Sequence, residues 1–257
     1  MTNLTQDANC YEINHQLAYY ECADSGHPSV SMVLSMMTMV SDAHSISLGL
    51  DRATVDATGG AWVVVGYDGN FASEQPTFGD QVIIGTRALA YNRFFALREF
   101  WLCDQRHQHE YVRLRALFVM MNLAKRRLMR IPDQLIVPFD SPLEKRLPRL
   151  TTPAKLGADF ASQTYRVRYF DIDINHHVNN ARYLDWVLDP LGADFLRRYQ
   201  PQSLAIKYGE EVKEGAVVES RYRIVHHEGV VKTVHEIWSA GQCCTTAELT
   251  WQPSVKL

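Results

Sequence analysis

The sequence predicts an α+β fold that occurs twice along one chain, with a long helix packed on an antiparallel sheet in each half. Two observations support this prediction. A strand-like segment leads into helical apolar spacing near residue 20 and again near residue 170, and each helical segment is followed by long segments of alternating polarity. Such alternation is typical of antiparallel strands with one buried face. One helix layer on one such sheet is an α+β arrangement.

Alternating apolar and polar residues predict where the strands lie. In the first half we expect strands over about 62–67, 80–90, 94–103 and 110–122, and in the second half over about 216–226, 230–239 and 242–251. A further strand over 164–170 is expected before the second helix, because Tyr165, Val167 and Tyr169 would share one face.

Apolar residues at helical spacing predict one long helix in each half. The first helix is indicated by Val30, Val33, Leu34, Met37 and Val40, and the second by Val178, Ala181, Leu184, Val187, Leu188 and Leu191. The second helix is expected to begin near Val178 or Asn179 and to end at Pro190, because proline cannot continue a helix.

The first half repeats the second in degenerate form. When Asp24 is aligned with Asp173, an offset of 149, Gly26 and Pro28 stand where the second half has an asparagine and a histidine. Farther along, Gly79 aligns with Gly215, which is an offset of 136. We therefore expect one catalytic site per chain, built from the second half.

Five prolines between residues 125 and 157 predict a connection that packs across the surface and is not a free linker. On this basis we expect residues 1–130 to form the first unit, 131–160 the connecting strap and 161–257 the second unit.

Composition excludes several classes of protein. The hydrophobic content of 46% is ample for a buried core, and the net charge of −3 argues against a general nucleic-acid binder. No apolar run reaches the length of a membrane span, and no secretory signal is expected. The five cysteines have no spacing typical of disulfide frameworks or zinc sites, so reduced thiols and a cytoplasmic location are expected, with no metal and no cofactor.

The most informative segment is 171–180, which reads Asp-Ile-Asp-Ile-Asn-His-His-Val-Asn-Asn. An extended or gently turning backbone would send Asp173, Asn175 and His177 toward one cleft, because alternate side chains share a side. A carboxylate can act as a base, an amide can donate to an oxyanion, and an imidazole can donate or shuttle a proton.

The run Asp171–Trp186 resembles the active-site segment of the acyl-[acyl carrier protein] thioesterases, the plant plastid enzymes and their bacterial relatives. The segments Trp62–Val65, Gln75–Asp80 and Met121–Leu128 are similar to that family too, and the resemblance extends from about Tyr11 to Trp251. It implies a tandem hot-dog fold, in which each half wraps an antiparallel sheet around a long helix. It also implies hydrolysis of fatty acyl-[acyl carrier protein] and release of free fatty acid.

The resemblance also implies roles for individual residues. Plant relatives carry a carboxylate followed by a cysteine in the segment that matches Ile206–Val212, and here Glu211 stands at the carboxylate and Val212 at the cysteine. A cysteine nucleophile is therefore excluded at this position, and a carboxylate-activated water remains. We expect Glu211 to be the general base, with Asp173 as partner or alternative base and Glu210 as the alternative if the alignment slips by one residue.

Asn175 is then expected to contact the thioester carbonyl or the water, and His177 to hydrogen-bond a carboxylate and orient the set. Backbone N–H groups near Val178 and Asn179 would complete the oxyanion site, where each donor typically contributes ~2.7–4 kcal/mol.

The remaining expectations concern the substrate. The first half would form the acyl-chain pocket, with Met32, Met36 and Trp62 as lining residues, because methionine suits adaptable pockets. An acidic carrier protein would dock on a basic cluster, for which Lys125, Arg126, Arg127 and Arg130 are the first candidates.

Three alternatives stay open: an acyl-coenzyme A thioesterase of the same fold, a hot-dog dehydratase, and a non-catalytic acyl-sensing or carrier-binding protein. Whether two chains pair as a homodimer is open as well.

Overall fold

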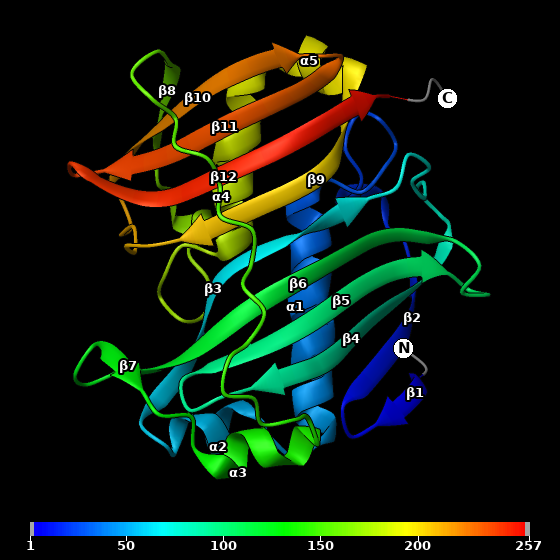
Figure 1. Cartoon of the computed structure of the whole chain (residues 1–257), viewed down its shortest axis with the longest axis vertical. Helices are drawn as coiled ribbons and strands as arrows, with labels where there is room; N and C mark the ends of the chain where they lie inside the picture. Colours follow the sequence, from blue (N-terminus) through cyan, green and yellow to red (C-terminus); the bar gives the residue numbers. More distant parts are fainter. Residues whose placement is uncertain (1–2, 255–257) are drawn as a thin grey trace.

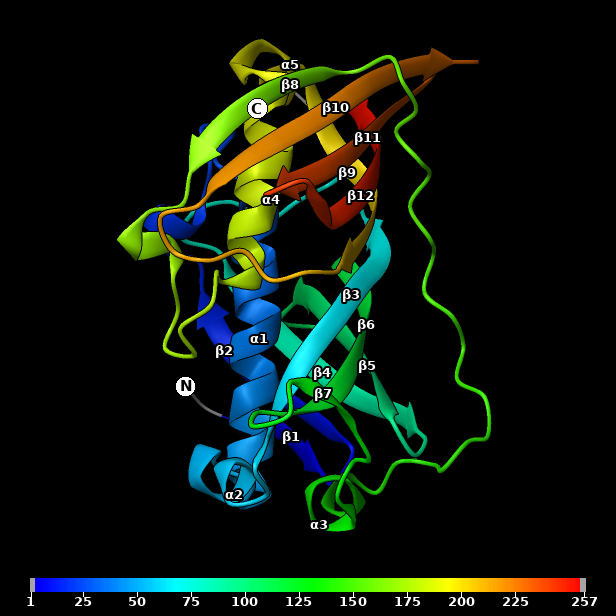
Figure 2. The same cartoon turned by 90° about the vertical axis from the view of Figure 1, so that its left-hand side faces the viewer.

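The computed structural model describes residues 3–254 as one antiparallel sheet that wraps around two main helices (Figures 1 and 2). The strands are β1 (Asn3–Asp7), β2 (Cys10–Gln16), β3 (Gly60–Phe71), β4 (Gln81–Tyr91), β5 (Phe95–Asp104), β6 (Glu110–Asn122), β7 (Arg127–Met129), β8 (Ala161–Arg166), β9 (Tyr199–Tyr208), β10 (Val217–His227), β11 (Val230–Ser239) and β12 (Gln242–Pro253). The helices are α1 (Val30–Ser47), α2 (Arg52–Asp56), α3 (Asp133–Ile136), α4 (Asn180–Leu188) and α5 (Ala193–Arg198), with 3-10 turns η1 (Tyr19–Glu21), η2 (Val137–Phe139), η3 (Tyr169–Asp171) and η4 (Asp189–Leu191).

The sheet joins the two halves of the chain edge to edge. Its order is β1-β2-β4-β5-β6-β3-β9-β12-β11-β10-β8, with β7 paired to β6, so strands of the first half meet those of the second only where β3 pairs with β9. The β4–β6 strands cover α1, and β9–β12 cover α4, on the same side of the continuous sheet (Figure 2). This is the tandem hot-dog arrangement that the resemblance implied.

The predicted strands after each helix are confirmed, most of them within a few residues of their expected ends. The strand expected over 164–170 is misplaced, because it ends at Arg166 and residues 169–171 form the 3-10 turn η3. Helix α4 begins at Asn180, with Asn179 as its N-cap, and the 3-10 turn that contains Pro190 follows it directly.

The internal repeat is real, but the offset of 149 around the catalytic segment is wrong by one residue. The isolated bridges Cys22–Pro28 and Ile172–Val178 are equivalent, which sets the offset at 150 (172 − 22 = 150). The backbone hydrogen bonds repeat with the same offset. The N–H of Ala23 donates to the carbonyl of His27 at 2.8 Å, and the N–H of Asp173 donates to the carbonyl of His177 at 2.9 Å.

The corrected alignment changes which residues the first half keeps. His27 lies opposite His177, and the degenerate half lacks both the aspartate and the asparagine, because Ala23 lies opposite Asp173 and Ser25 lies opposite Asn175. Asp24, which the offset of 149 placed opposite Asp173, lies opposite Ile174. Farther along, the offset of 136 is confirmed, because Leu17 accepts from the N–H of Gly79 and Val167 accepts from the N–H of Gly215.

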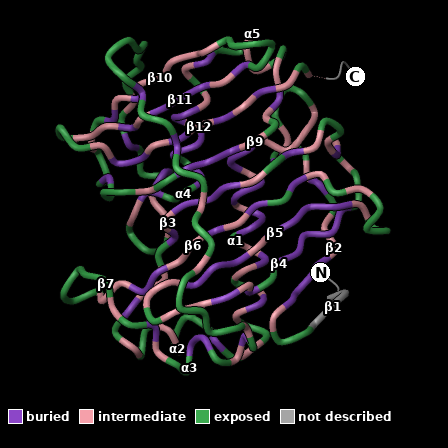
Figure 3. The backbone as a smooth tube through the Cα atoms, in the orientation of Figure 1, coloured by how far each residue is buried: buried purple, intermediate pink, exposed green. Residues whose placement is uncertain are grey.

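One hydrophobic core runs through both halves and contains buried residues of α1, α4 and the strands of the sheet. Figure 3 colours the buried residues purple along the backbone. A second cluster surrounds Leu50, Met120 and Leu135 and includes residues of α3 and η2. None of the helices between residues 3 and 254 combines the length and apolar character that crossing a bilayer requires.

The strap after η2 runs along the convex side of the sheet and is held there by carboxylates. Asp68 is 3% exposed and accepts hydrogen bonds from Arg115 Nη2 at 2.7 Å and from the N–H and hydroxyl of Thr151 at 2.7 and 2.9 Å. The Ala154 N–H donates to Glu248 at 2.8 Å. These bonds satisfy strap N–H groups that the sheet cannot reach.

Two glycines let β3 fit between its neighbours. A Cβ built on Gly66 would lie 2.3 Å from the carbonyl oxygen of Ile206 on β9, and one on Gly69 would lie 2.0 Å from the carbonyl oxygen of Arg113 on β6. Backbone atoms cannot move aside as a flexible side chain can, so both contacts require glycine.

Gly66→Ala is therefore expected to weaken the join of the two halves and to lower the free energy of unfolding by about 1–3 kcal/mol, the usual cost of overpacking. Chemical denaturation measures it. Gly209→Ala is the matched control, because its Cβ would find its nearest neighbour at 3.4 Å, an ordinary contact. Equal stability of the two variants would contradict the role assigned to Gly66.

His235 on β11 is fully buried, and neither ring nitrogen has a hydrogen-bond partner among residues 3–254. Burial lowers the pKa of this imidazole to about 3, because the charged form would be desolvated without a counter-ion. Below the ordinary pKa of 6.5 the unfolded chain takes up a proton that the folded chain refuses, so stability falls as the pH falls toward 3.

Between pH 7 and pH 5 this histidine alone should cost about 2 kcal/mol of folding stability. Denaturant titrations of His235→Leu at the two pH values should show a smaller pH dependence than the parent protein. His227→Leu, at an exposed position, should keep the parent's dependence. An unchanged dependence in His235→Leu would show that the buried imidazole is not responsible.

Candidate active site

The segment expected to carry catalysis is a closed turn between η3 and α4. The Asp173 N–H donates to the carbonyl of His177 at 2.9 Å, and His176 adopts the left-handed region with φ of 62°. The expectation of an extended or gently turning backbone is therefore wrong. A tight turn sets the directions of the Asp173, Asn175 and His177 side chains, and the alternation of side chains along a strand does not apply to them.

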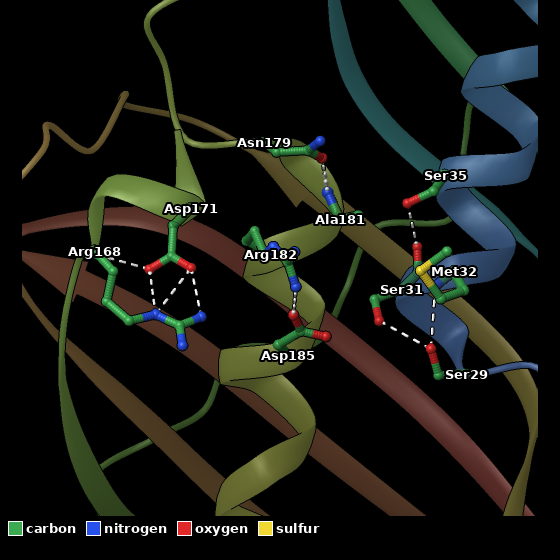
Figure 4. A network of polar contacts seen from close by, with 10 residues as sticks. All are labelled: Ser29, Ser31, Met32, Ser35, Arg168, Asp171, Asn179, Ala181, Arg182 and Asp185. Carbon is green, nitrogen blue, oxygen red and sulfur yellow. Dashed lines mark hydrogen bonds and ion pairs between the residues drawn. The ribbon is translucent and has the colours of Figure 1, made fainter. Parts of the chain in front are cut away.

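A buried carboxylate holds this turn. Asp171 is 1% exposed and accepts from the Arg168 N–H at 2.8 Å and from Arg168 Nη2 at 2.7 Å (Figure 4). Its own carbonyl accepts from the Asn179 N–H at 2.9 Å. Burial alone would raise the pKa of Asp171, but the hydrogen bonds from Arg168 outweigh it and hold the pKa below its ordinary value. Glu21 closes the equivalent turn of the first half, where it accepts from the Ala18 N–H at 2.8 Å.

His177 and Glu211 meet at the surface of the second half. His177 Nε2 lies 3.3 Å from Glu211 Oε2, and the two side chains are 41% and 45% exposed. An imidazole beside a carboxylate that is open to solvent can orient that carboxylate for proton transfer to or from water. The structure thus brings together two of the four residues expected to be catalytic.

Glu211 lies on the loop between β9 and β10, which is attached to α4 through the next residue. Val212 is 3% exposed, and its N–H donates to the hydroxyl of Tyr183 at 3.3 Å. Glu210 is exposed and makes no hydrogen bond or ion pair in the described part of the chain. The contact with His177 therefore favours Glu211 over Glu210 as the acidic partner.

Asp173 and Asn175 belong to the same turn but have different surroundings. Asp173 Oδ1 accepts from the Asn175 N–H at 2.8 Å, so one carboxylate oxygen stabilises the turn. The Asn175 side chain is exposed and forms no hydrogen bond with residues 3–254, which leaves its amide open to a ligand.

The start of α4 offers fewer free donors than expected. The Asn179 N–H is already donated to Asp171, and Asn179 Oδ1 accepts from Ala181 N–H at 2.9 Å (Figure 4). Asn179 therefore caps the helix, and its amide is not available to an oxyanion. Of the two backbone donors that were expected, Val178 remains.

The expected acyl-chain residues do not form one group. Met36 is 1% exposed in the main core and Met32 is half-buried against it, whereas Trp62 packs against the second cluster around Leu135. A hollow of about 680 Å³ lies on the convex side beneath the strap, between Asp68, Arg113 and Thr151, and none of the expected site residues lines it.

The expected carrier-binding cluster is partly engaged in ion pairs. Arg130 Nη2 lies 3.2 Å from Asp133 Oδ1, and Arg126 Nη2 lies 2.5 Å from Glu211 Oε2. Lys125 and Arg127 are exposed and make no ion pair with the described residues. Sequence reasoning missed the contact of Arg126 with the candidate base, because 85 positions separate the two residues. It also missed Asp171, although the equivalent position in the repeat, Glu21, is acidic too.

Two family models match the chain consecutively. The N-terminal domain of acyl-ACP thioesterases matches residues 8–139, and the C-terminal domain matches residues 155–253. The chain belongs to the acyl-ACP thioesterase family. The residues of the His177–Glu211 contact both lie in the second matched region.

Curated relatives of this family member include plant enzymes. A chloroplastic acyl-[acyl-carrier-protein] hydrolase of Cuphea viscosissima is 25% identical over 233 residues, which cover 84% of this chain and 56% of the relative. A chloroplastic palmitoyl-acyl carrier protein thioesterase of Arabidopsis thaliana is 25% identical over 230 residues. The chain thus spans about half the length of the curated relatives it matches.

Solved structures of similar fold cover nearly the whole chain. A Lactobacillus plantarum protein assigned provisionally as an oleoyl thioesterase is 34% identical, with a TM-score of 0.93 over 97% of this chain and 98% of that one. The 12:0-ACP thioesterase of Umbellularia californica is 22% identical with a TM-score of 0.82, over 95% of this chain and 94% of that one, and it supports the fold alone.

Asp171→Asn should loosen the turn between η3 and α4 in this family member. The substitution keeps the volume but puts an NH2 group or a neutral oxygen where the carboxylate accepts from the backbone and side chain of Arg168. The free energy of unfolding should therefore fall by about 1–3 kcal/mol, and amide exchange over residues 172–178 should become faster.

Denaturation and hydrogen-exchange mass spectrometry test this expectation. Asp185→Asn is the matched control, because its carboxylate is 39% exposed and forms an ion pair with Arg182 within one helix. If exchange in the turn is equally slow in Asp171→Asn and the control, Asp171 does not hold the turn.

Proposed function

We propose that this chain hydrolyses the thioester of fatty acyl-[acyl carrier protein], releases free fatty acid and so ends chain elongation. The observation that carries the proposal is the contact of His177 with Glu211. Asn175 belongs to the same turn as His177, and its side chain is exposed. The family to which the chain belongs supports the thioester as the bond that is cleaved.

The proposed reaction has two steps. Glu211 takes a proton from a water molecule as the water oxygen bonds to the thioester carbonyl carbon, and the carbonyl oxygen becomes an oxyanion. The oxyanion then re-forms the carbonyl, the carbon–sulfur bond breaks, and the leaving sulfur takes the proton back from Glu211. The products are a free fatty acid and the thiol of the carrier, so no further reactant is required.

Each of the other residues supports one part of this reaction. His177 holds the carboxylate of Glu211 in position. The free amide of Asn175 and the N–H of Val178 donate to the oxyanion. Asp173 shapes the turn through its bond to the Asn175 N–H, which favours Glu211 as the base and Asp173 as its partner.

A division of labour along the chain follows. Residues 1–130 form the unit that receives the acyl chain, residues 131–160 form the strap, and residues 161–257 form the catalytic unit. Met32 and Met36 lie on α1, which packs against α4, so an acyl chain held near them would run toward the catalytic turn. Trp62 is less suited to this role because it packs in the other cluster.

The partner is an acidic carrier protein, and the exposed Lys125 and Arg127 offer it unpaired positive charge. None of the five cysteines forms a disulfide bond. Free thiols are typical of a reducing compartment, which supports the cytoplasmic location expected from the sequence.

Purified protein should release thiol from a ladder of acyl chains on the carrier protein faster than from the same chains on coenzyme A. His177→Ala and Glu211→Gln should each lower kcat by at least about 10²-fold, because each removes part of the machinery that activates water. Thiol release, followed with a chromogenic disulfide, measures both expectations.

His176→Asn and Glu210→Gln are the neighbouring controls. The first keeps a residue that tolerates the left-handed backbone, and both replace exposed side chains outside the proposed contact. Faster release from coenzyme A would assign the chain to the acyl-coenzyme A thioesterases. No release from either ladder would defeat the hydrolase proposal and favour a sensing or carrier-binding role.

A further inference from the structure

Arg126 belongs to the first half of the chain but ends at the catalytic carboxylate of the second. It lies at the tip of the β6–β7 hairpin, and its Nη2 approaches Glu211 Oε2 to 2.5 Å. His177 Nε2 lies 3.3 Å from the same oxygen. Three side chains from three separate segments therefore meet at one atom, and the first half provides one of them.

From this geometry we infer that Arg126 is a positioning residue for Glu211, so that the catalytic site is completed by the half that has lost its own. This inference rests on the proposed hydrolase function. It moves Arg126 from the carrier-binding cluster to the machinery that orients the general base.

The Glu211 side chain requires a positioning contact because the loop is anchored through the backbone of the next residue, Val212. That anchor does not fix the Glu211 carboxylate. The backbone is held at Val212, whereas the Glu211 side chain is 45% exposed and free to change rotamer. The guanidinium and the imidazole both approach Oε2, so we assign Oε1 as the oxygen that accepts a proton from water. A charge-assisted bond from a planar guanidinium fixes a carboxylate better than an imidazole alone.

The hairpin is built to present this arginine. Asn122 Oδ1 accepts from the Lys125 N–H at 2.8 Å and closes the turn, and Arg126 adopts a left-handed conformation with φ of 47°. Lys125 and Arg127, on either side of Arg126, have no such partner in the described chain.

The ion pair of Arg126 with Glu211 is too exposed for a contribution to folding stability to explain it. The Arg126 and Glu211 side chains are 70% and 45% exposed, and ion pairs in that range contribute little to folding. Removing the guanidinium should therefore leave the fold intact, and a loss of rate can be assigned to the position of the carboxylate.

The experiment compares Arg126→Gln and Arg126→Lys with the parent on two substrates, an acyl chain on the carrier protein and the same chain on N-acetylcysteamine, which lacks the carrier. Arg126→Gln should lower kcat on the order of 10-fold to 100-fold with both substrates and change KM little, because a misplaced catalytic group costs rate. Arg126→Lys, which keeps the charge without the planar fork, should recover part of the rate. Melting temperatures should stay within about a degree of the parent.

Two further variants sharpen the result. Arg52→Gln is the matched control, since Arg52 is 57% exposed and forms a surface ion pair with Asp56 in the same half; its kcat should equal the parent's. In a Glu211→Gln background, adding Arg126→Gln should cost no further rate, because a positioning residue acts only through the group it positions.

Four results would overturn the inference. A rise in KM for the carrier substrate alone, with kcat unchanged on N-acetylcysteamine, would return Arg126 to carrier docking. A full additional loss in the Glu211→Gln background would show that Arg126 acts on something other than Glu211. Absence of thiol release by the parent protein would defeat the hydrolase proposal and this inference with it, whereas an active parent with an equally active Arg126→Gln would defeat the inference alone.

Discussion

The pairing of β3 with β9 is the contact on which the rest of the architecture depends. Among the strands that the structure describes, it is the single place where the sheet of the first half continues into that of the second, and it runs from the pair Gly66–Lys207 to the pair Asn70–Ser203. Because the two sheets share this seam, α1 and α4 lie on the same side and contact each other. The seam also brings the β6–β7 hairpin of the first half within reach of the loop that follows β9. Without it, Arg126 and Glu211 would have no common surface.

The two halves show how one backbone geometry can carry different chemistry. The same 3-10 turn, bridge and left-handed residue occur at an offset of 150, with Gly26 in one copy and His176 in the other. Both turns are closed by a buried acid, Glu21 or Asp171, because the backbone N–H groups at such a turn require an acceptor wherever it is built. The residues proposed to be catalytic are exposed, so replacing them in the first half cost the fold little.

This separation of buried supports from exposed reactive groups explains the character of the site. Asp171 and Val212 are buried and fix the backbone, whereas His177, Glu211 and Arg126 are between 41% and 70% exposed and meet above them. Side chains on two loops and a hairpin keep their geometry only if each loop is anchored from below. The backbone that carries the residues proposed to be catalytic is therefore fixed by hydrogen bonds of buried groups that take no part in the proposed reaction.

The sequence by itself determined most of the strands that follow the helices, the two helices and the presence of a repeat, because hydrophobic period and capping residues act locally. It did not determine where β8 ends. It also pointed to Asp173, Asn175, His177 and Glu211, through spacing and family resemblance. It placed the repeat one residue out of register around Asp24, because a turn has no period to align.

Only the tertiary structure decided that the Asn179 amide is occupied, that Trp62 packs away from Met36, and that Arg126 contacts Glu211. Those outcomes depend on contacts between residues far apart in the chain, which are set by the seam between the two sheets and leave no mark in local sequence patterns.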